Sequence, residues 1–174
     1  MSVRYARTQA EKLVDRLGMS SVPVDVEKIA EQLGLPVMYA DLGAGVSGLL
    51  ISDGAEAHIC VQERDAPVRQ RFTIAHEIGH HHLRHQFEPG HHVHVDRGHY
   101  VSERGPRASD GADPKEVEAN RFAACLLMPM RLVREKVAEL GGGPLLDHHV
   151  SHLAGAFRVS EQAMTIRLSS LGLL

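Results

Sequence analysis

The sequence lacks tryptophan, has few other aromatic residues and contains only two cysteines. Aromatic residues make up 4% of the chain, so aliphatic side chains must supply most of a hydrophobic core. Cys60 and Cys125 are too few for a disulfide framework and predict reduced thiols in the cytoplasm. No apolar run approaches the roughly 20 residues that cross a bilayer, and the first residues lack the apolar segment of a secretory signal. These absences argue against a disulfide-rich secreted protein and against a membrane protein.

A large excess of charge of one sign is also missing. The chain has 19 Lys and Arg against 22 Asp and Glu, which gives a formal net charge of −3. Because phosphate contacts need a basic surface, direct binding of nucleic acid is not expected. With 43% hydrophobic and 24% charged residues, the composition is that of a globular protein, and 174 residues predict a single domain over 1–174.

Histidine, in contrast, is abundant and clustered. The chain has 13 histidines, and nine of them lie between positions 76 and 99. Imidazole is the commonest metal ligand in proteins and titrates near neutral pH. The cluster is internal and interrupted, unlike a purification tag, so it indicates a metal site.

The apolar pattern predicts an α+β fold. Strand-like runs at 35–40, 46–52 and 57–62 predict a small antiparallel three-stranded sheet, and helical spacing elsewhere predicts about six helices around it. One of these helices spans about 67–85. Residues 86–114 are rich in Pro, Gly, Asp, Ser and His and predict a long loop with one short strand near 93–95. Residues 145–174 predict two helices that resemble a helix-turn-helix.

The predicted helix over 67–85 carries the pattern His-Glu-x-x-His. His76 and His80 are four residues apart, so they stand one turn apart on the same helix face and can bind one metal ion. Glu77 follows the first histidine and can reach a water on that metal without being a ligand. This is the arrangement of a metal-dependent hydrolase. The alternative is a solvated helix face that happens to be rich in histidine.

A catalytic zinc usually has three protein ligands, so a third must come from elsewhere. The best candidates are Glu116 and Glu118, in the first turn of the helix predicted at 114–128. Glu118 lies one turn before Phe122 on the apolar face and can point inward, whereas Glu116 is expected to cap the helix or to face solvent. The pattern therefore favours Glu118.

The His-Glu-Ile-Gly-His of residues 76–80, followed by Glu-Ala-Asn-x-Phe-Ala-Ala-x-Leu-Leu-Met-Pro at 118–129, resembles the ImmA/IrrE family of zinc metallopeptidases. Residues 24–34 and 153–172 also resemble that family. The resemblance implies a zincin-like α+β domain of the gluzincin type, with zinc held by His76, His80 and Glu118 and with Glu77 as the general base. It also implies a protein substrate or partner, an Xre-type helix-turn-helix repressor or antitoxin, and an extended substrate held along strand 46–52 or 57–62.

Several alternatives stay open at this point. The chain could instead be a non-catalytic partner of an Xre-type antitoxin, with a structural metal, or a metal-responsive regulator. His91, His92 and His94 are expected on the surface of the loop, or else in a second metal site. The two helices within 145–174 complete the domain, dock a partner or bind DNA. Four residues could assist catalysis by hydrogen bonding, and the sequence does not choose among them: His82, His85, Tyr100 and His149.

Overall fold

The computed structural model describes residues 2–52, 56–85, 93–96, 113–141 and 143–174. These residues form seven helices and a four-stranded mixed sheet. In chain order the elements are α1 (Val3–Arg16), α2 (Val26–Gln32), β1 (Val37–Ala40), β2 (Gly48–Ser52), β3 (Ala57–Gln62), α3 (Pro67–His82), β4 (Val93–Asp96), α4 (Pro114–Leu127), α5 (Met130–Ala138), α6 (Asp147–Phe157) and α7 (Glu161–Ser170). The α+β class is confirmed. Most of the predicted loop, 86–92 and 97–112, lies outside the described residues.

The sheet differs from the predicted one in two respects. Its strand order is β1-β3-β2-β4, and β1 runs parallel to β3, whereas β2 pairs antiparallel with both β3 and β4. The prediction of three antiparallel strands is therefore wrong in strand number and in the direction of β1. Alternation within a strand indicates which side chains share a face, but it does not identify the neighbouring strand. The short strand expected near 93–95 is present as β4.

Neither strand that was expected to hold a substrate has an open edge. β3 lies between β1 and β2, and β2 lies between β3 and β4. Leu50 of β2 is paired with His94 of β4, and the Ser47 N–H donates a 2.9 Å hydrogen bond to the Asp96 carbonyl. In the described structure, β4 thus covers the edge of β2.

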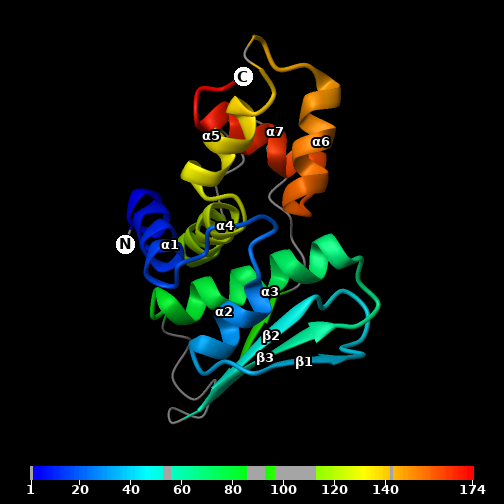
Figure 1. Cartoon of the computed structure of the whole chain (residues 1–174). Coiled ribbons are helices and arrows are strands. Elements are labelled where there is room, and N and C mark those ends of the chain that lie inside the picture. Colours follow the sequence, from blue (N-terminus) through cyan, green and yellow to red (C-terminus); the bar gives the residue numbers. More distant parts are fainter. Residues whose placement is uncertain (1, 53–55, 86–92, 97–112, 142) are drawn as a thin grey trace.

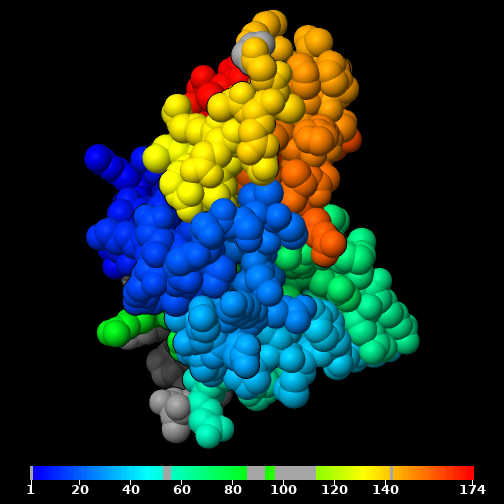
Figure 2. Space-filling view, in the orientation of Figure 1, coloured from blue at the N-terminus to red at the C-terminus, as the bar shows by residue number. Residues whose placement is uncertain are grey.

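The helices form a second layer on the sheet (Figure 1). α3 lies across one face of the sheet, α4 packs against α3 and α1, and α5–α7 lie at the end away from the strands. In the view of Figure 2, α1 and α2 fill the space between the sheet below and the carboxy-terminal helices above. Among the described residues, no helix is long and apolar enough to cross a membrane.

The two carboxy-terminal helices are joined to the rest of the chain by a buried cation. The Arg167 side chain of α7 is only 2% exposed. Its Nε donates to the Met128 carbonyl at 2.8 Å, and its Nη2 binds Glu11 Oε1 of α1 at 2.8 Å. Ser160 caps α7 by accepting from the Ala163 N–H at 3.1 Å. The helices of the predicted helix-turn-helix are therefore packed on α4 and α1 at this point.

The crossing of α3 and α4 depends on Gly79. A Cβ atom built on Gly79 would lie 3.2 Å from Phe122 Cδ1 and 3.3 Å from the Ala119 Cα and carbonyl oxygen of α4. A glycine in a helix costs about 1 kcal/mol relative to alanine, so its presence inside α3 needs a packing reason. The close approach of the α4 backbone supplies that reason, and it brings the two helices of the candidate site together.

Replacing Gly79 by valine is expected to destabilise the fold by about 2–3 kcal/mol, because the added methyl groups overpack the α3–α4 contact. Gly155 of α6 offers a matched control, since a Cβ there meets no atom of the described residues within 4 Å. Gly155→Val should be neutral or stabilising, because valine has the higher helix propensity. Urea unfolding followed by circular dichroism measures both. Equal midpoints for the two variants would contradict the close packing.

Candidate metal centre

α3 brings the two histidines of the motif together in the protein interior. His76 and His80 are 2% and 1% exposed. Their Nε2 atoms are 3.0 Å apart, as expected for imidazoles one turn apart on one helix face. The two predicted histidines therefore converge on a common point.

A glutamate from α4 and a histidine from β4 complete the group. Glu116 Oε2 lies 3.3 Å from His76 Nε2, and Glu116 Oε1 lies 3.3 Å from His80 Nε2. His94 Nε2 lies 2.9 Å from Glu116 Oε1. One donor atom from each of these four residues falls within 4.8 Å of the others, so the group can hold a metal ion. A second such group, His76 with Glu77 and Asp96, overlaps it.

The predicted third ligand, Glu118, is not part of this four-residue group. Its carboxylate is buried, as expected, but it accepts a hydrogen bond from His85 Nε2 at 3.1 Å. Residues two apart on a helix point in different directions, and Glu116 shares its face with Asn120, which also contacts α3. The structure therefore places Glu116 where the sequence assigned Glu118. The four-residue spacing of Glu116 and Asn120 is the signal that could have indicated this.

Hydrogen bonds on the far side of each imidazole fix its tautomer. His76 Nδ1 lies 2.9 Å from Asn120 Oδ1, which only accepts, so His76 donates and its Nε2 keeps a lone pair. His80 Nδ1 lies 3.0 Å from His85 Nδ1. Burial lowers the pKa of His85, so this ring is neutral; its Nε2–H donates to Glu118 and its Nδ1 accepts from His80. His80 Nε2 is then also left with a lone pair.

The donor set fits a small divalent cation. The Nε2 atoms of His76 and His80 face each other across 3.0 Å, and the carboxylate oxygens of Glu116 lie 3.3 Å from them. Tetrahedral zinc with bonds of about 2.0–2.1 Å places its ligand atoms about 3.3 Å apart. Burial opposes protonation of His76, but hydrogen bonding to Glu116 raises its pKa, so without a metal a proton on His76 supplies part of the positive charge that a cation would bring. Burial lowers the pKa of His80 to about 3, so this ring does not supply the positive charge itself.

His94 also carries positive charge when the group holds no metal. Burial alone would lower its pKa, but hydrogen bonds to Glu116 and Glu77 raise it to about 10. Hydrogen bonds from His76 and His94 hold the pKa of Glu116 below its usual range, against the effect of burial. Protonated His94 therefore offsets part of the negative charge of Glu77 and Glu116 when no metal is bound.

Glu77 is placed beside the four-residue group and belongs to the overlapping one. It is completely buried, and its Oε2 accepts from His94 Nδ1 at 3.1 Å. Its Oε1 has no hydrogen-bond partner among the described residues. Burial raises the pKa of this carboxyl, although His94 and His76 act in the opposite direction. An unpaired oxygen on a buried carboxylate is costly unless it has a function, such as accepting a proton.

Two residues of the site were not assigned from the sequence. His85 was one of four candidates left open, and His94 was expected on the loop surface or in a second metal site. The alternation Val93-His94-Val95-Asp96 was the available signal for His94. Val93 and Val95 are 41% and 39% exposed, whereas His94 and Asp96 are half-buried and face α3. Of the other histidines considered, His149 caps α6 by accepting from the Leu146 N–H at 3.1 Å. His91, His92 and Tyr100 lie outside the described residues.

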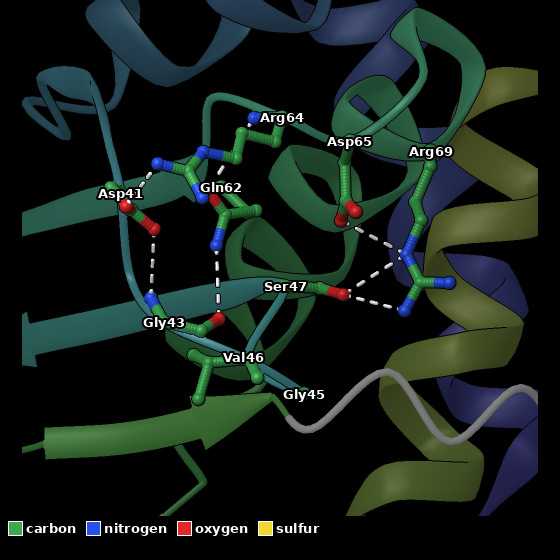
Figure 3. Close-up of a pocket in the computed structure, with 10 residues that line it drawn as sticks. Asp41, Gly43, Gly45, Val46, Ser47, Gln62, Arg64, Asp65 and Arg69 are labelled. Atoms are coloured by element: carbon green, nitrogen blue, oxygen red, sulfur yellow. Dashed lines mark hydrogen bonds and ion pairs between the residues drawn. The ribbon is translucent and has the colours of Figure 1, made fainter.

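A polar pocket lies at the start of α3, next to the end of β4 (Figure 3). Arg69 of α3 donates to Ser47 Oγ from Nε at 3.0 Å and from Nη2 at 2.6 Å, and it pairs with Asp65 at 3.0 Å. Ser47 is also bonded through its N–H to the carbonyl of Asp96. These contacts join α3, β2 and β4 at one end of the candidate metal centre.

The His85–Glu118 hydrogen bond is expected to stabilise the protein by a coupling energy of about 1–3 kcal/mol. Replacing only His85 by leucine deprives the buried Glu118 carboxylate of this hydrogen bond, whereas replacing both residues by leucine removes the penalty. The double variant should therefore be more stable than the sum of the single changes predicts. Urea unfolding of the metal-free proteins measures the double-mutant cycle. Additive effects would show that the two side chains do not interact.

A protein-family model matches most of this chain. The peptidase M78 family, described as the IrrE N-terminal-like domain, matches residues 30–169. The chain belongs to this family. The resemblance expected from residues 76–80 and 118–129 is thus confirmed, and so is a metallopeptidase-like domain that contains the candidate metal centre. Among curated proteins, none matches this chain.

A solved structure has the same fold. It is titled a Mycobacterium tuberculosis transcriptional regulator and is 17% identical to this chain, with a TM-score of 0.60. The alignment covers 97% of this chain and 48% of the other, so this chain spans about half the length of that protein. At this identity, the likeness concerns the fold alone.

Proposed function

We propose that the protein is a zinc-dependent endopeptidase of the gluzincin type, with the ligands His76, His80 and Glu116 in a zincin-like domain. The observation that carries the proposal is Glu77, a completely buried carboxylate beside the ligand group whose Oε1 has no partner among the residues that the structure describes. A structural metal site has no need for such a base. The M78 family membership supports the same chemistry.

The residues of the site have separate roles in hydrolysis. A zinc ion held there would act as a Lewis acid toward a peptide carbonyl. Glu77 takes a proton from the attacking water at its Oε1 and returns it to the leaving amine. Burial raises the pKa of Glu77 above its ordinary value, which suits a group that must both accept and release a proton. Asn120 and His85 hold His76 and His80 in the tautomers that leave Nε2 bare.

We further propose that the substrate is an Xre-type helix-turn-helix repressor, whose cleavage switches on its genes, and that this takes place in the cytoplasm. The support is the ImmA/IrrE resemblance together with the like fold of a protein titled a transcriptional regulator. The net charge of −3 favours a protein substrate over direct binding of DNA.

A cleavage assay tests this function. The zinc-loaded protein is incubated with the purified Xre-type repressor encoded nearest its own gene, and the products are analysed by intact mass spectrometry. We expect one defined cut that is absent with Glu77→Gln. An intact repressor in a stable complex would favour the second candidate, a non-catalytic partner with a structural metal. That candidate has one specific observation behind it, the presence of a fourth metal-binding group, His94.

A further inference from the structure

We propose that β4 keeps the enzyme latent: His94 is a removable fourth zinc ligand, and an extended segment of the protein substrate opens the site by replacing β4 on β2. This inference rests on the proposed peptidase function and adds its regulation. It concerns the described residues of β4 and their contacts with β2, α3 and α4.

One imidazole fills the metal position that catalysis needs and also contacts the general base. His94 Nε2 lies 2.9 Å from Glu116 Oε1, inside the ligand group, and His94 Nδ1 lies 3.1 Å from Glu77 Oε2. A zinc ion with four protein ligands is closed, whereas a catalytic zinc keeps one position open. While His94 is in place, the fourth position is filled and the general base is engaged. Hydrolysis therefore requires His94 to leave.

Of the four ligands, His94 can leave the metal at the lowest cost in free energy. His76, His80 and Glu116 lie on α3 and α4, two helices packed against each other in the core. His94 lies on a four-residue strand at the edge of the sheet. Its neighbours Val93 and Val95 are 41% and 39% exposed, so β4 buries little apolar surface. Segments with few buried apolar contacts open at low free energy.

Once β4 has left, the edge of β2 would place a bound peptide beside Glu77 and the metal ligands. An extended peptide adds to a strand edge through main-chain hydrogen bonds. β2 runs directly over the base, since a Cβ on Gly48 would lie 3.4 Å from Glu77 Oε1. In the register of β4, the residue opposite Leu50 takes the place of His94. A substrate segment in that register thus lies beside Glu77 and the ligand group.

The test uses the full chain loaded with cobalt(II) and two readouts that do not depend on hydrolysis. X-ray absorption counts the imidazole ligands, and titration with acetohydroxamate, followed in the visible spectrum, reports an open metal position. The wild-type protein should show three imidazoles. His94→Ala should show two and bind acetohydroxamate at least about tenfold more tightly, since the closed state lowers the apparent affinity by the fraction of open protein. His152→Ala, at an exposed histidine of α6, should behave like the wild type.

The outcomes separate this inference from the proposed function. Two imidazoles in the wild type, with equal acetohydroxamate affinity in His94→Ala, would overturn latency and leave the three-ligand peptidase site standing. A His94→Ala protein that takes up no cobalt would also overturn it, because His94 would then be indispensable rather than removable. If the wild type itself takes up no cobalt, the peptidase function fails as well. His94→Asn, which keeps a polar partner for Glu77, replaces His94→Ala if circular dichroism shows that the alanine variant is unfolded.

Discussion

Zinc affinity is expected to fall by more than about 100-fold in Glu116→Ala and by only about 10–100-fold in Glu118→Ala, because the loss of a ligand costs more than the loss of a supporting hydrogen bond. Glu116 contributes two oxygens, each 3.3 Å from an imidazole Nε2 of the motif. Glu118 acts one step further away, through His85 and then His80. Competition with a chromogenic chelator measures both affinities.

The comparison also decides between the two glutamates as ligands. Glu139→Ala is the matched control, because this glutamate forms a surface ion pair with Lys136 at the end of α5. It should bind zinc as the wild type does. If Glu118→Ala lost more affinity than Glu116→Ala, the sequence-based assignment of Glu118 would be correct and the packed α4 face would have to rotate on metal binding.

The histidines of the motif could be predicted from sequence because their geometry is local. A spacing of four residues on one helix is sufficient to bring His76 and His80 together, and it needs no knowledge of the rest of the fold. The cap of α7 at Ser160 is local in the same way, since its side chain accepts from an N–H three residues further along the chain. Family resemblance then extended these local signals to most of the chain.

The remaining ligands could not be predicted in this way because their positions depend on long-range packing. Whether Glu116 or Glu118 faces α3 is decided by the rotation of α4, which Gly79 and Ala119 set at the helix crossing. His94 reaches the site only because β4 pairs with β2 in one register; a shift of one residue would turn it to the exposed face. The same pairing covers the strand edge that the sequence left open for substrate.

Hydrolysis of the substrate is expected to fall by about 10²–10⁴-fold in Glu77→Gln, while zinc binding stays unchanged, because the substitution removes a general base and keeps the shape of the side chain. The glutamine carbonyl oxygen still accepts from His94 Nδ1, so the contact that holds this side chain while His94 is in place is preserved. Only the ability to take up a proton at Oε1 is lost. Rates come from mass spectrometry of the cut repressor, and zinc content from elemental analysis.

Measuring hydrolysis and zinc content together distinguishes the loss of the base from the loss of the metal. Glu116→Ala lowers hydrolysis through the loss of zinc, whereas Glu77→Gln must lower it with zinc in place. Full activity in a zinc-loaded Glu77→Gln protein would remove Glu77 as the base, and its buried Oε1, unpaired within the described part of the chain, would then have no chemical reason. Loss of zinc in Glu77→Gln would instead make Glu77 a ligand. The overlapping His76, Glu77 and Asp96 group would then be the metal site.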